Sequence, residues 1–374
     1  MKFFKYLFIL LSLILIVSCG GEEEEEDWGN DGDGGNSGNN EENGGWESQE
    51  DKPGKVLKTE GFAGIYTFAI GLDDILYVGG ATQEESKKSD AFLVAFDAKG
   101  KELWRKQWDY QESADTVNYL VTDQYGNIYV AGDTTNGDVP FVIKFAPDGT
   151  KIWEQFPELE TMNSLAVDKS NNIYIVGGVN KSSKIIKYSM EGKSLWINDV
   201  DEGTIVTLGV DSIGNVYAGG YTYTSLFAEN NGKMDAFLMK IALDGTPLWG
   251  KQWGDEGDDR STALVVDSND NIYVVGNSNG DSDMFFKFSS IGEVVWQKTE
   301  TYYSIAIDKN NHIYPYQRDG NIAKYDSDGK YLGSFLLDNI GVMQIVCDNK
   351  DNIYMLTNKD YKTNIIKIAI SDFK

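Results

Sequence analysis

Residue types that perform chemistry are unevenly represented in this sequence of 374 residues. It contains 1 histidine, His312, and 2 cysteines, Cys19 and Cys347, against 59 aspartates and glutamates. Metal sites built from several histidines, and nucleophilic triads with a histidine base, therefore have little to draw on. A carboxylate pair could support glycoside cleavage or lyase chemistry, but spacing identifies no such pair. We predict no catalytic and no metal-ligating residues, which favours a protein that is not an enzyme.

One acidic loop, Gly254–Asp259, leaves a cofactor open. Its carboxylates Asp255, Asp258 and Asp259 could surround Ca²⁺, which prefers oxygen ligands. The alternative is an ordinary solvated acidic loop, and exposed carboxylates are the commoner case. We therefore expect no cofactor, with Ca²⁺ as the exception that the sequence leaves open.

The elements that must position any such site recur along the chain. A pattern of two short strands and a polar turn, seen most clearly in Ala263–Gly276, repeats seven times with a tyrosine in its second strand. In six copies an aspartate precedes the tyrosine by six residues, at the turn. Repeats of about 40–50 residues with strand patterning are typical of β-propeller blades. The seven tyrosines are Tyr77, Tyr129, Tyr174, Tyr217, Tyr273, Tyr314 and Tyr354.

Each copy predicts four strands. In the turn between the first two strands, the aspartate can accept hydrogen bonds from amides two or three residues on, and the Gly, Asn or Asp that follows tolerates a positive φ. Five fourth strands carry a tryptophan at an equivalent position. One tryptophan per blade favours packing between neighbouring blades over a ring of ligand-stacking platforms. These residues are Trp104, Trp153, Trp196, Trp249 and Trp296.

The two ends of the repeat region predict a closed ring. The seventh copy supplies three strands and then the chain stops, whereas Lys52–Lys58 has the pattern of a fourth strand and precedes the first copy. We expect this segment to complete the last blade beside Asn364–Ile370, which would remove both open sheet edges. The predicted fold is therefore an all-β, seven-bladed propeller of four-stranded antiparallel blades, spanning residues 53–374. Copy six, with Pro315 in its second strand, is expected to be locally irregular.

Several phrases resemble the bacterial seven-bladed β-propeller repeat (SBBP) family. They are Asp90–Asp97, Lys101–Trp108 and Asp235–Ile241, together with the Asp-x-x-Gly-Asn-Ile-Tyr-Val turns. The resemblance implies the fold and little about activity, because members of the family mostly lack an assigned reaction. The Gly-Lys-x-Leu-Trp fourth strands also resemble quinoprotein-like propellers, which include an outer-membrane assembly factor. Seven copies rather than eight count against that alternative.

The N-terminus predicts export and a lipid anchor. Lys2 and Lys5 precede a short apolar run, which is typical of a signal peptide over residues 1–18. The sequence Ile16–Gly20 resembles a bacterial lipobox, which implies cleavage before Cys19 and lipidation of its thiol. A secretory signal without lipidation is the alternative. Residues 19–52 are acidic and rich in Gly and Asn, and we expect a disordered tether. By analogy with bacterial lipoproteins, we expect the protein to be located in the cell envelope, at the outer membrane, either periplasmic or surface-exposed.

The net charge of −26 narrows the range of partners. Nucleic acid and anionic lipid are bound by clusters of Lys and Arg, so we expect no nucleic acid and contact with the membrane only through the lipid anchor. We expect a monomer whose partner is a protein or glycan of the envelope.

Binding is expected at the face that carries the longer connections, because variable loops on a rigid frame are where such folds bind partners. Thr82–Ser89, Thr222–Lys233 and Gly254–Arg260 are the longest insertions. The leading hypothesis is a lipid-anchored binding or scaffold module that is not an enzyme. Its alternatives are an envelope hydrolase or lyase with a carboxylate site at the channel mouth, and the assembly factor. The candidate binding residues are Asp115, Asn163, Thr204, Tyr223, Phe227, Asp255, Asp258, Asp259, Arg260, Tyr302 and Gln344.

Overall fold

A computed structural model describes ten stretches of the chain, which belong to one compact unit within residues 43–374. The predicted signal peptide, the lipidation site Cys19, most of the predicted tether and the middle of the Thr82–Ser89 insertion lie outside the described residues. The described stretches are residues 45–48, 54–57, 64–82, 88–110, 113–134, 139–180, 182–279, 284–337, 340–359 and 362–373.

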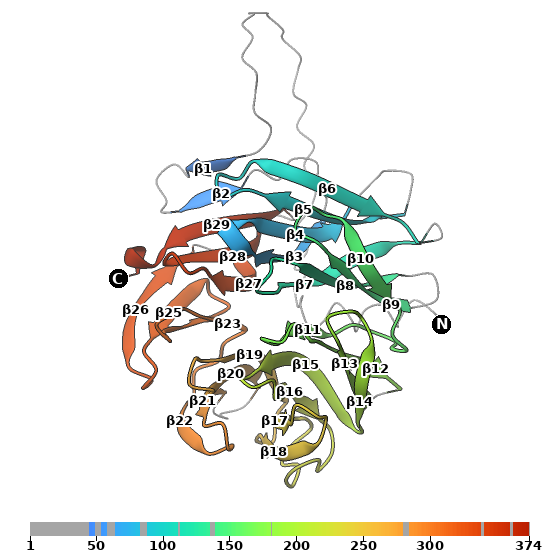
Figure 1. The fold of residues 1–374 in the computed structure, drawn as a ribbon. Helices are drawn as coiled ribbons and strands as arrows, with labels where there is room; N and C mark the ends of the chain where they lie inside the picture. Colours follow the sequence, from blue (N-terminus) through green and yellow to red (C-terminus); the bar gives the residue numbers. More distant parts are fainter. Residues whose placement is uncertain are drawn as a thin grey trace, which may run out of the picture. The chain divides into compact units, whose positions relative to one another are not determined.

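The described strands form seven antiparallel sheets, which are the seven predicted blades (Figure 1). In the first six blades, four strands that are consecutive in the chain pair in order. Blade 1 is β3 (Gly64–Ile70), β4 (Leu76–Ala81), β5 (Ala91–Phe96) and β6 (Glu102–Trp108). Blade 2 is β7 (Asp115–Thr122), β8 (Ile128–Thr134), β9 (Val139–Phe145) and β10 (Lys151–Gln155). Blade 3 is β11 (Ser164–Val167), β12 (Ile173–Val179), β13 (Ser182–Tyr188) and β14 (Ser194–Val200).

The remaining blades follow the same order. Blade 4 is β15 (Gly203–Val210), β16 (Val216–Thr222), β17 (Asp235–Ile241) and β18 (Pro247–Trp253). Blade 5 is β19 (Asp259–Val266), β20 (Ile272–Ser278), β21 (Phe285–Phe288) and β22 (Val294–Lys298). Blade 6 is β23 (Ser304–Ile307), β24 (Ile313–Tyr316), β25 (Asn321–Tyr325) and β26 (Tyr331–Leu336). Blade 7 is β27 (Gly341–Cys347), β28 (Asn352–Lys359), β29 (Lys362–Ala369), β2 (Lys55–Leu57) and β1 (Trp46–Ser48).

The blades form a closed ring. The first strands of successive blades contact one another from β3 through β7, β11, β15, β19 and β23 to β27, and β27 contacts β3. The apolar core lies between neighbouring blades: one cluster joins Leu93 of blade 1 to Val117 and Phe141 of blade 2. Because each blade buries apolar side chains against its neighbours, the sheets stabilise one another around the ring.

Ring closure occurs where the sequence predicts it. Strand β2 pairs with β29, with Lys55 opposite Lys367 and Val56 opposite Ile366. At the first strands, the Gln344 side chain accepts a hydrogen bond from the Phe68 amide (3.0 Å) and donates one to the Phe68 carbonyl (2.9 Å). The last and first blades are therefore joined by backbone pairing at the outside and by a side-chain amide at the inside.

The fifth strand of blade 7 differs from the sequence prediction. Residues 46–48 fall in the segment expected to be a tether, yet they form β1, which pairs with β2. The Trp46 ring lies 5.8 Å from that of Tyr354. The Trp46 amide donates to the Lys99 carbonyl of blade 1 at 3.3 Å. Trp46 thus contacts the seventh tyrosine in a blade whose fourth strand has no tryptophan.

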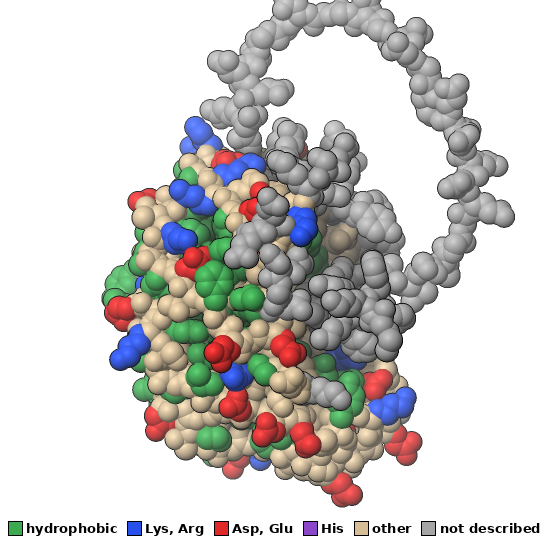
Figure 2. Space-filling model, turned by 90° about the vertical axis from the view of Figure 1, so that its right-hand side faces the viewer, with side chains coloured by type: hydrophobic (Ala, Val, Ile, Leu, Met, Phe, Trp, Pro, Cys, Tyr) green, Lys and Arg blue, Asp and Glu red, His purple; other side chains and the backbone are tan. Residues whose placement is uncertain are grey.

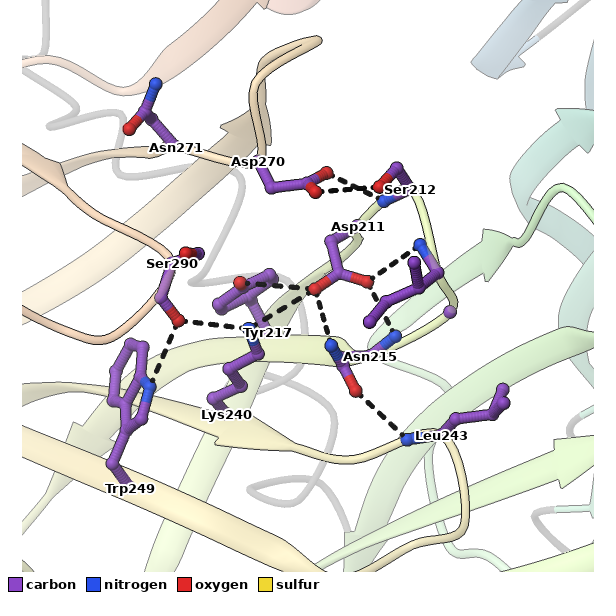
Figure 3. Close-up of polar contacts among 12 residues, drawn as sticks. Asp211, Ser212, Asn215, Tyr217, Lys240, Leu243, Trp249, Asp270, Asn271 and Ser290 are labelled. Atoms are coloured by element: carbon purple, nitrogen blue, oxygen red, sulfur yellow. Dashed lines mark hydrogen bonds and ion pairs between the residues drawn. The ribbon is translucent and has the colours of Figure 1, made fainter.

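A buried polar unit repeats from blade to blade, and Figure 3 shows it in blade 4. Asp211 accepts hydrogen bonds from the Asn215 amide (2.8 Å) and the Tyr217 hydroxyl (3.4 Å). The Lys240 ammonium lies 3.3 Å from Asp211 and 4.8 Å from the centre of the Tyr217 ring. Tyr217 in turn packs against Trp249, with ring centres 6.0 Å apart. The spacing of aspartate and tyrosine that repeats along the sequence therefore corresponds to a single structural unit.

In blades 2 to 5 this unit ties the blade to the next one. Lys240 Nζ and Trp249 Nε1 both donate to one carbonyl, that of Ser290 in the turn between strands three and four of blade 5, at 3.0 and 3.4 Å. A Cβ added to Gly292 in that turn would lie 2.9 Å from the Trp249 ring, and Gly292 has a φ of 82°. The tryptophans are thus anchors between blades, as predicted. The same shared carbonyl joins Lys144 and Trp153 to Met190, Lys187 and Trp196 to Leu243, and Lys287 and Trp296 to Ser327.

Blade 6 departs from the regular pattern, as Pro315 predicts. The pairs between β24 and β25 lie on either side of the proline, at Ile313 with Tyr325 and at Tyr316 with Ile322. This blade has no tryptophan in its fourth strand. Phe373, directly after the short 3₁₀ helix η3 (Ile370–Asp372), packs against the Tyr314 ring instead, at 5.3 Å.

Candidate functional site

The two faces of the ring are built differently. In blades 2 to 7 the turns between strands one and two follow one scheme: Asp211 Oδ1, for example, accepts from the amides of Ile213 and Asn215. Neighbouring turns are also linked, since Ser212 donates from its amide and its hydroxyl to Asp270 at 2.8 and 2.7 Å. We call this the turn face. The opposite face carries the connections between strands two and three and between blades, and we call it the loop face.

The exposed side chains of the ring include hydrophobic ones. Figure 2 shows one side of the molecule, where they occur in small groups among acidic and basic residues. Ile213 on the turn face is 70% exposed and Tyr223 on the loop face is 60% exposed. Exposed hydrophobic side chains therefore occur on both faces. A candidate binding site must be identified from how neighbouring side chains are arranged.

The loop of residues 223–234 is held against blade 4 by one glutamine. Gln252 Oε1 accepts hydrogen bonds from the amides of Leu226 (2.9 Å) and Phe227 (3.0 Å). The Phe227 ring packs on Phe237 at 5.8 Å, and an added Cβ on Gly250 would collide with it. Phe227, a predicted binding residue, is therefore largely an anchor for its own loop.

Aromatic and cationic side chains meet where this loop leaves the sheet. Tyr221 and Tyr223 contact edge to face with ring centres 5.9 Å apart. The Arg260 guanidinium of blade 5 lies 5.7 Å from the Tyr221 ring, within cation–π range. Thr204 pairs with Tyr221 across the sheet. These four residues, Thr204, Tyr221, Tyr223 and Arg260, form the rim patch, which offers an exposed aromatic surface beside a cation.

The sequence predicted three members of the rim patch and missed Tyr221. The signal was available, because Tyr221 and Tyr223 alternate around Thr222 at the end of a strand, which places both tyrosines on one side of the sheet. Arg260 was predicted from its position before a first strand, and it is in fact the second residue of β19.

Other predicted binding residues connect blades. Asn163 donates from Nδ2 to the Ile205 carbonyl of the next blade at 3.0 Å, and Gln344 closes the ring as described above. Tyr302 is 1% exposed and its hydroxyl bonds that of Tyr325 at 2.9 Å. Asp115 is 0% exposed. The structure thus places Asp115 and Tyr302 inside the protein, where neither side chain reaches the channel mouth.

The acidic loop also divides into half-buried and fully buried carboxylates. Asp255 accepts from the Gly257 amide at 2.8 Å, and Asp258 accepts from Asn279 Nδ2 at 3.2 Å. Asp259, the first residue of β19, is fully buried. Asp235, at the start of β17, is fully buried as well. Because both are inaccessible, this pair does not present carboxylates to a substrate.

The single histidine has a structural position. His312 Nδ1 lies 2.9 Å from Asp308 Oδ2, in the place that asparagine holds in other turns. Among the residues that the structure describes, no three His, Cys, Asp or Glu side chains converge as a metal cage. Nor does any helix in that part of the chain have the length and apolarity needed to span a membrane.

A shallow groove lies between blades 4 and 5. Trp253 and Phe286 line it with Val294, and the two aromatic rings are 4.9 Å apart. Trp108 holds the corresponding place between blades 1 and 2, where it packs on Phe141 at 6.0 Å. This second set of tryptophans also packs between blades.

Comparison with known proteins supports the fold. Residues 248–282 match the model of the SBBP β-propeller repeat. Among solved structures, BamB from Moraxella catarrhalis is 14% identical with a TM-score of 0.52, over 84% of this chain and 94% of BamB. The WD40 domain of Neurospora crassa Pan2 is 12% identical with a TM-score of 0.57, over 82% of this chain and 89% of that domain. The Dos1 propeller is 10% identical with a TM-score of 0.55, over 82% and 78%. These low identities establish likeness of fold alone. No curated protein sequence matches significantly.

Proposed function

We propose that this seven-bladed propeller, which carries the SBBP β-propeller repeat, is a lipid-anchored module of the cell envelope that binds a protein or glycan through its loop face. The observation that carries the proposal is the rim patch. An exposed tyrosine, supported by a second tyrosine and an arginine, has the composition of binding hot spots. The frame beneath it is held together, because the polar unit of blade 4 ties that blade to blade 5.

The chemistry of the rim patch suits such partners. Aromatic rings bind the apolar faces of sugars and of protein side chains, and a guanidinium donates hydrogen bonds to carboxylates or hydroxyls. Partial burial raises the pKa of Tyr223, with Tyr221 adding to the effect, so the phenol stays neutral and can donate a hydrogen bond. No reaction is needed for this role. BamB resembles this chain in fold, but that likeness does not transfer a function to this chain. The assembly factor therefore remains the alternative.

Pull-down from envelope extracts tests the binding role. A Tyr223→Ser, Arg260→Ser variant is expected to retain at most about a tenth of the partner, because loss of a hot spot of about 1.4 kcal/mol or more weakens affinity tenfold. Partners are identified by mass spectrometry, and protease treatment of the extract separates protein from glycan. Ile213→Ser, which removes a 70% exposed apolar side chain from the turn face, is the matched control and should bind normally.

The outcome decides between the faces. Normal binding by the rim-patch variant would contradict the proposal. Loss of binding in the Ile213→Ser variant alone would move the site to the turn face.

The lipid anchor is a separate proposal, supported by the sequence Ile16–Gly20 around Cys19. A Cys19→Ala variant is expected to leave the membrane fraction for the soluble fraction, because the diacylglycerol attachment point is gone. Cell fractionation and labelling with a radioactive fatty acid measure the change. Retention of label by the variant, or an unlabelled wild-type chain, would favour a secretory signal without lipidation.

A further inference from the structure

Two junctions in the ring are near copies of each other, and they differ in one respect that points to a ligand. Between blades 1 and 2, and between blades 4 and 5, a Lys-Gln-Trp strand end leads through a short loop to a buried aspartate, Asp115 or Asp259. The amides of both aspartates donate to the preceding blade, to Ser89 O at 2.8 Å and to Met234 O at 2.7 Å. The two aspartates are therefore structural equivalents.

In the first junction the buried carboxylate is fully satisfied by protein. Asp115 Oδ1 accepts from the Ser113 hydroxyl at 2.8 Å, and Oδ2 accepts from the Tyr110 amide at 2.6 Å. Each oxygen of this carboxylate has a donor. Such pairing is what a buried carboxylate normally requires.

In the second junction one of these donors is missing. Asp259 Oδ2 accepts from the Asp255 amide at 2.8 Å, in the place of the Tyr110 amide. Two residues before Asp259, however, the chain has Gly257 where the first junction has Ser113, so that hydroxyl is absent, although the Ser278 hydroxyl of β20 donates a hydrogen bond to the Asp259 carboxylate. Asp259 Oδ1 is buried and has no hydrogen-bond partner among the described residues.

A second buried carboxylate, that of Asp235, also has one oxygen that no described residue donates to. Asp235 Oδ2 accepts from Gln252 Nε2 at 3.0 Å and from the Asn231 amide at 3.2 Å. Asp235 Oδ1 is buried and, within the described part of the chain, has no partner. Asp235 comes from β17 of blade 4 and Asp259 from β19 of blade 5, so the two approach from different blades.

The two carboxylates lie close together, on either side of the Gly254 position. A Cβ added to Gly254 would lie 2.6 Å from Asp235 Oδ1 and 2.9 Å from Asp259 Oδ2. Two buried like charges at this range repel, so the pair needs either a shared proton or a cation.

We propose that Asp235 and Asp259 bind a divalent cation, Ca²⁺, that links blade 4 to blade 5 beneath the loop face. The donors are hard oxygens, which Ca²⁺ prefers, and the two carboxylates balance its charge. Ca²⁺ takes six to eight ligands, and main-chain carbonyls and water commonly complete the set. The site does not depend on the binding function proposed above.

The cation site also bears on the long loop. Gln252 donates to Asp235 and accepts from the amides of Leu226 and Phe227. A cation that fixes Asp235 therefore also fixes the glutamine that holds residues 223–234 in place.

Thermal unfolding of the full chain, stripped with EDTA and titrated with CaCl₂, tests the site. The Tm of the wild type is expected to rise with Ca²⁺, because a ligand that binds the folded state stabilises it. Asp235→Asn and Asp259→Asn should abolish the rise. Both variants are expected to fold in EDTA, since an amide in place of one carboxylate can donate to the other. Asp258→Asn removes the same charge from a half-buried position of the loop and should respond like the wild type.

Three results would overturn the proposal. They are a wild-type Tm that is indifferent to millimolar Ca²⁺, a rise that persists in the Asp235→Asn or Asp259→Asn variant, and a rise that Asp258→Asn abolishes as fully as they do. A Tm that does not respond to Ca²⁺ would mean that the two carboxylates share a proton instead. A rise that persists in the Asp235→Asn or Asp259→Asn variant, or that Asp258→Asn abolishes, would indicate general attraction of Ca²⁺ to an acidic chain.

Discussion

Replacing Lys240 with methionine is expected to lower the free energy of unfolding by about 3–5 kcal/mol, because removing one partner of a buried ion pair leaves the other charge uncompensated. Lys240 lies 3.3 Å from Asp211, and the two side chains are 8% and 2% exposed. Methionine fills most of the lysine volume, so the loss reports the charge and the hydrogen bond to Ser290 rather than a cavity. Urea unfolding of the wild type and the variant measures it.

A double-mutant cycle separates the pair from its surroundings. Asp211→Asn keeps an oxygen for the turn amides and removes the charge. The double variant should be more stable than the two single losses predict, with a coupling of about 0.5–3 kcal/mol. Additive losses would show that the two charges do not interact, and the repeated unit would then owe its stability to packing alone.

The same pair has a predictable acid dependence. Although burial opposes ionisation, hydrogen bonds from Asn215 and Lys240 hold the pKa of Asp211 below its ordinary value. A carboxyl with a lower pKa when folded contributes stability above the unfolded pKa of about 3.9, and that stability is lost as pH falls through the folded pKa. The Tm of the Lys240→Met variant should therefore fall less steeply below about pH 4 than that of the wild type.

Blade 1 supports this interpretation of the pair from within the chain. At the place of the turn aspartate it has Gly71, and opposite Tyr77 it has Ala95 where the other blades have lysine. Both charges are absent together, although Tyr77 and Trp104 still pack at 5.9 Å. A buried aspartate and a buried lysine are thus kept or lost as a unit, which is expected if each alone is costly.

The fold was predictable from sequence because its information is local and repeated. The spacing of aspartate and tyrosine defines a turn and a strand within a few residues. It recurs in six of the seven copies. The third-strand lysine was missed because its distance from the tyrosine varies with the connecting loop, so no fixed spacing marks it. Trp46 and Phe373 were missed because they reach their tyrosines through tertiary contacts alone.

The site was less predictable, and the reason lies in the first strands. Several contain a β-bulge, as between Val117 and Tyr119 in β7 and between Ser261 and Ala263 in β19. A bulge adds one residue, so the side chains before it change faces relative to a simple alternation. Asp115 and Asp259 both precede such a bulge, and both are buried rather than exposed at the mouth. The position of a residue along a first strand therefore did not predict which face its side chain would occupy.

A chain that begins at Lys58 is expected to be much less stable than one that begins at Gly45, and to aggregate. The shorter chain lacks β1 and β2, so β29 becomes an open strand edge, which is a template for pairing between molecules. It also loses Leu57, which is 1% exposed and packs with Phe68 of blade 1 and Leu356 of blade 7. Loss of a buried leucine side chain alone costs about 2–5 kcal/mol.

The matched comparison isolates ring closure from the N-terminal segment as a whole. Both truncated chains lack residues 1–44, so differences in solubility or Tm between them come from residues 45–57. Size-exclusion chromatography and thermal unfolding of the two chains measure the effect. Equal Tm values and monomeric elution of both would mean that contacts between β27 and β3, with Gln344 bridging to Phe68, close the ring without an outer strand. A large loss means that the inner contacts are insufficient, because one side-chain amide cannot replace the apolar surface that Leu57 and Trp46 bury between the last blade and the first.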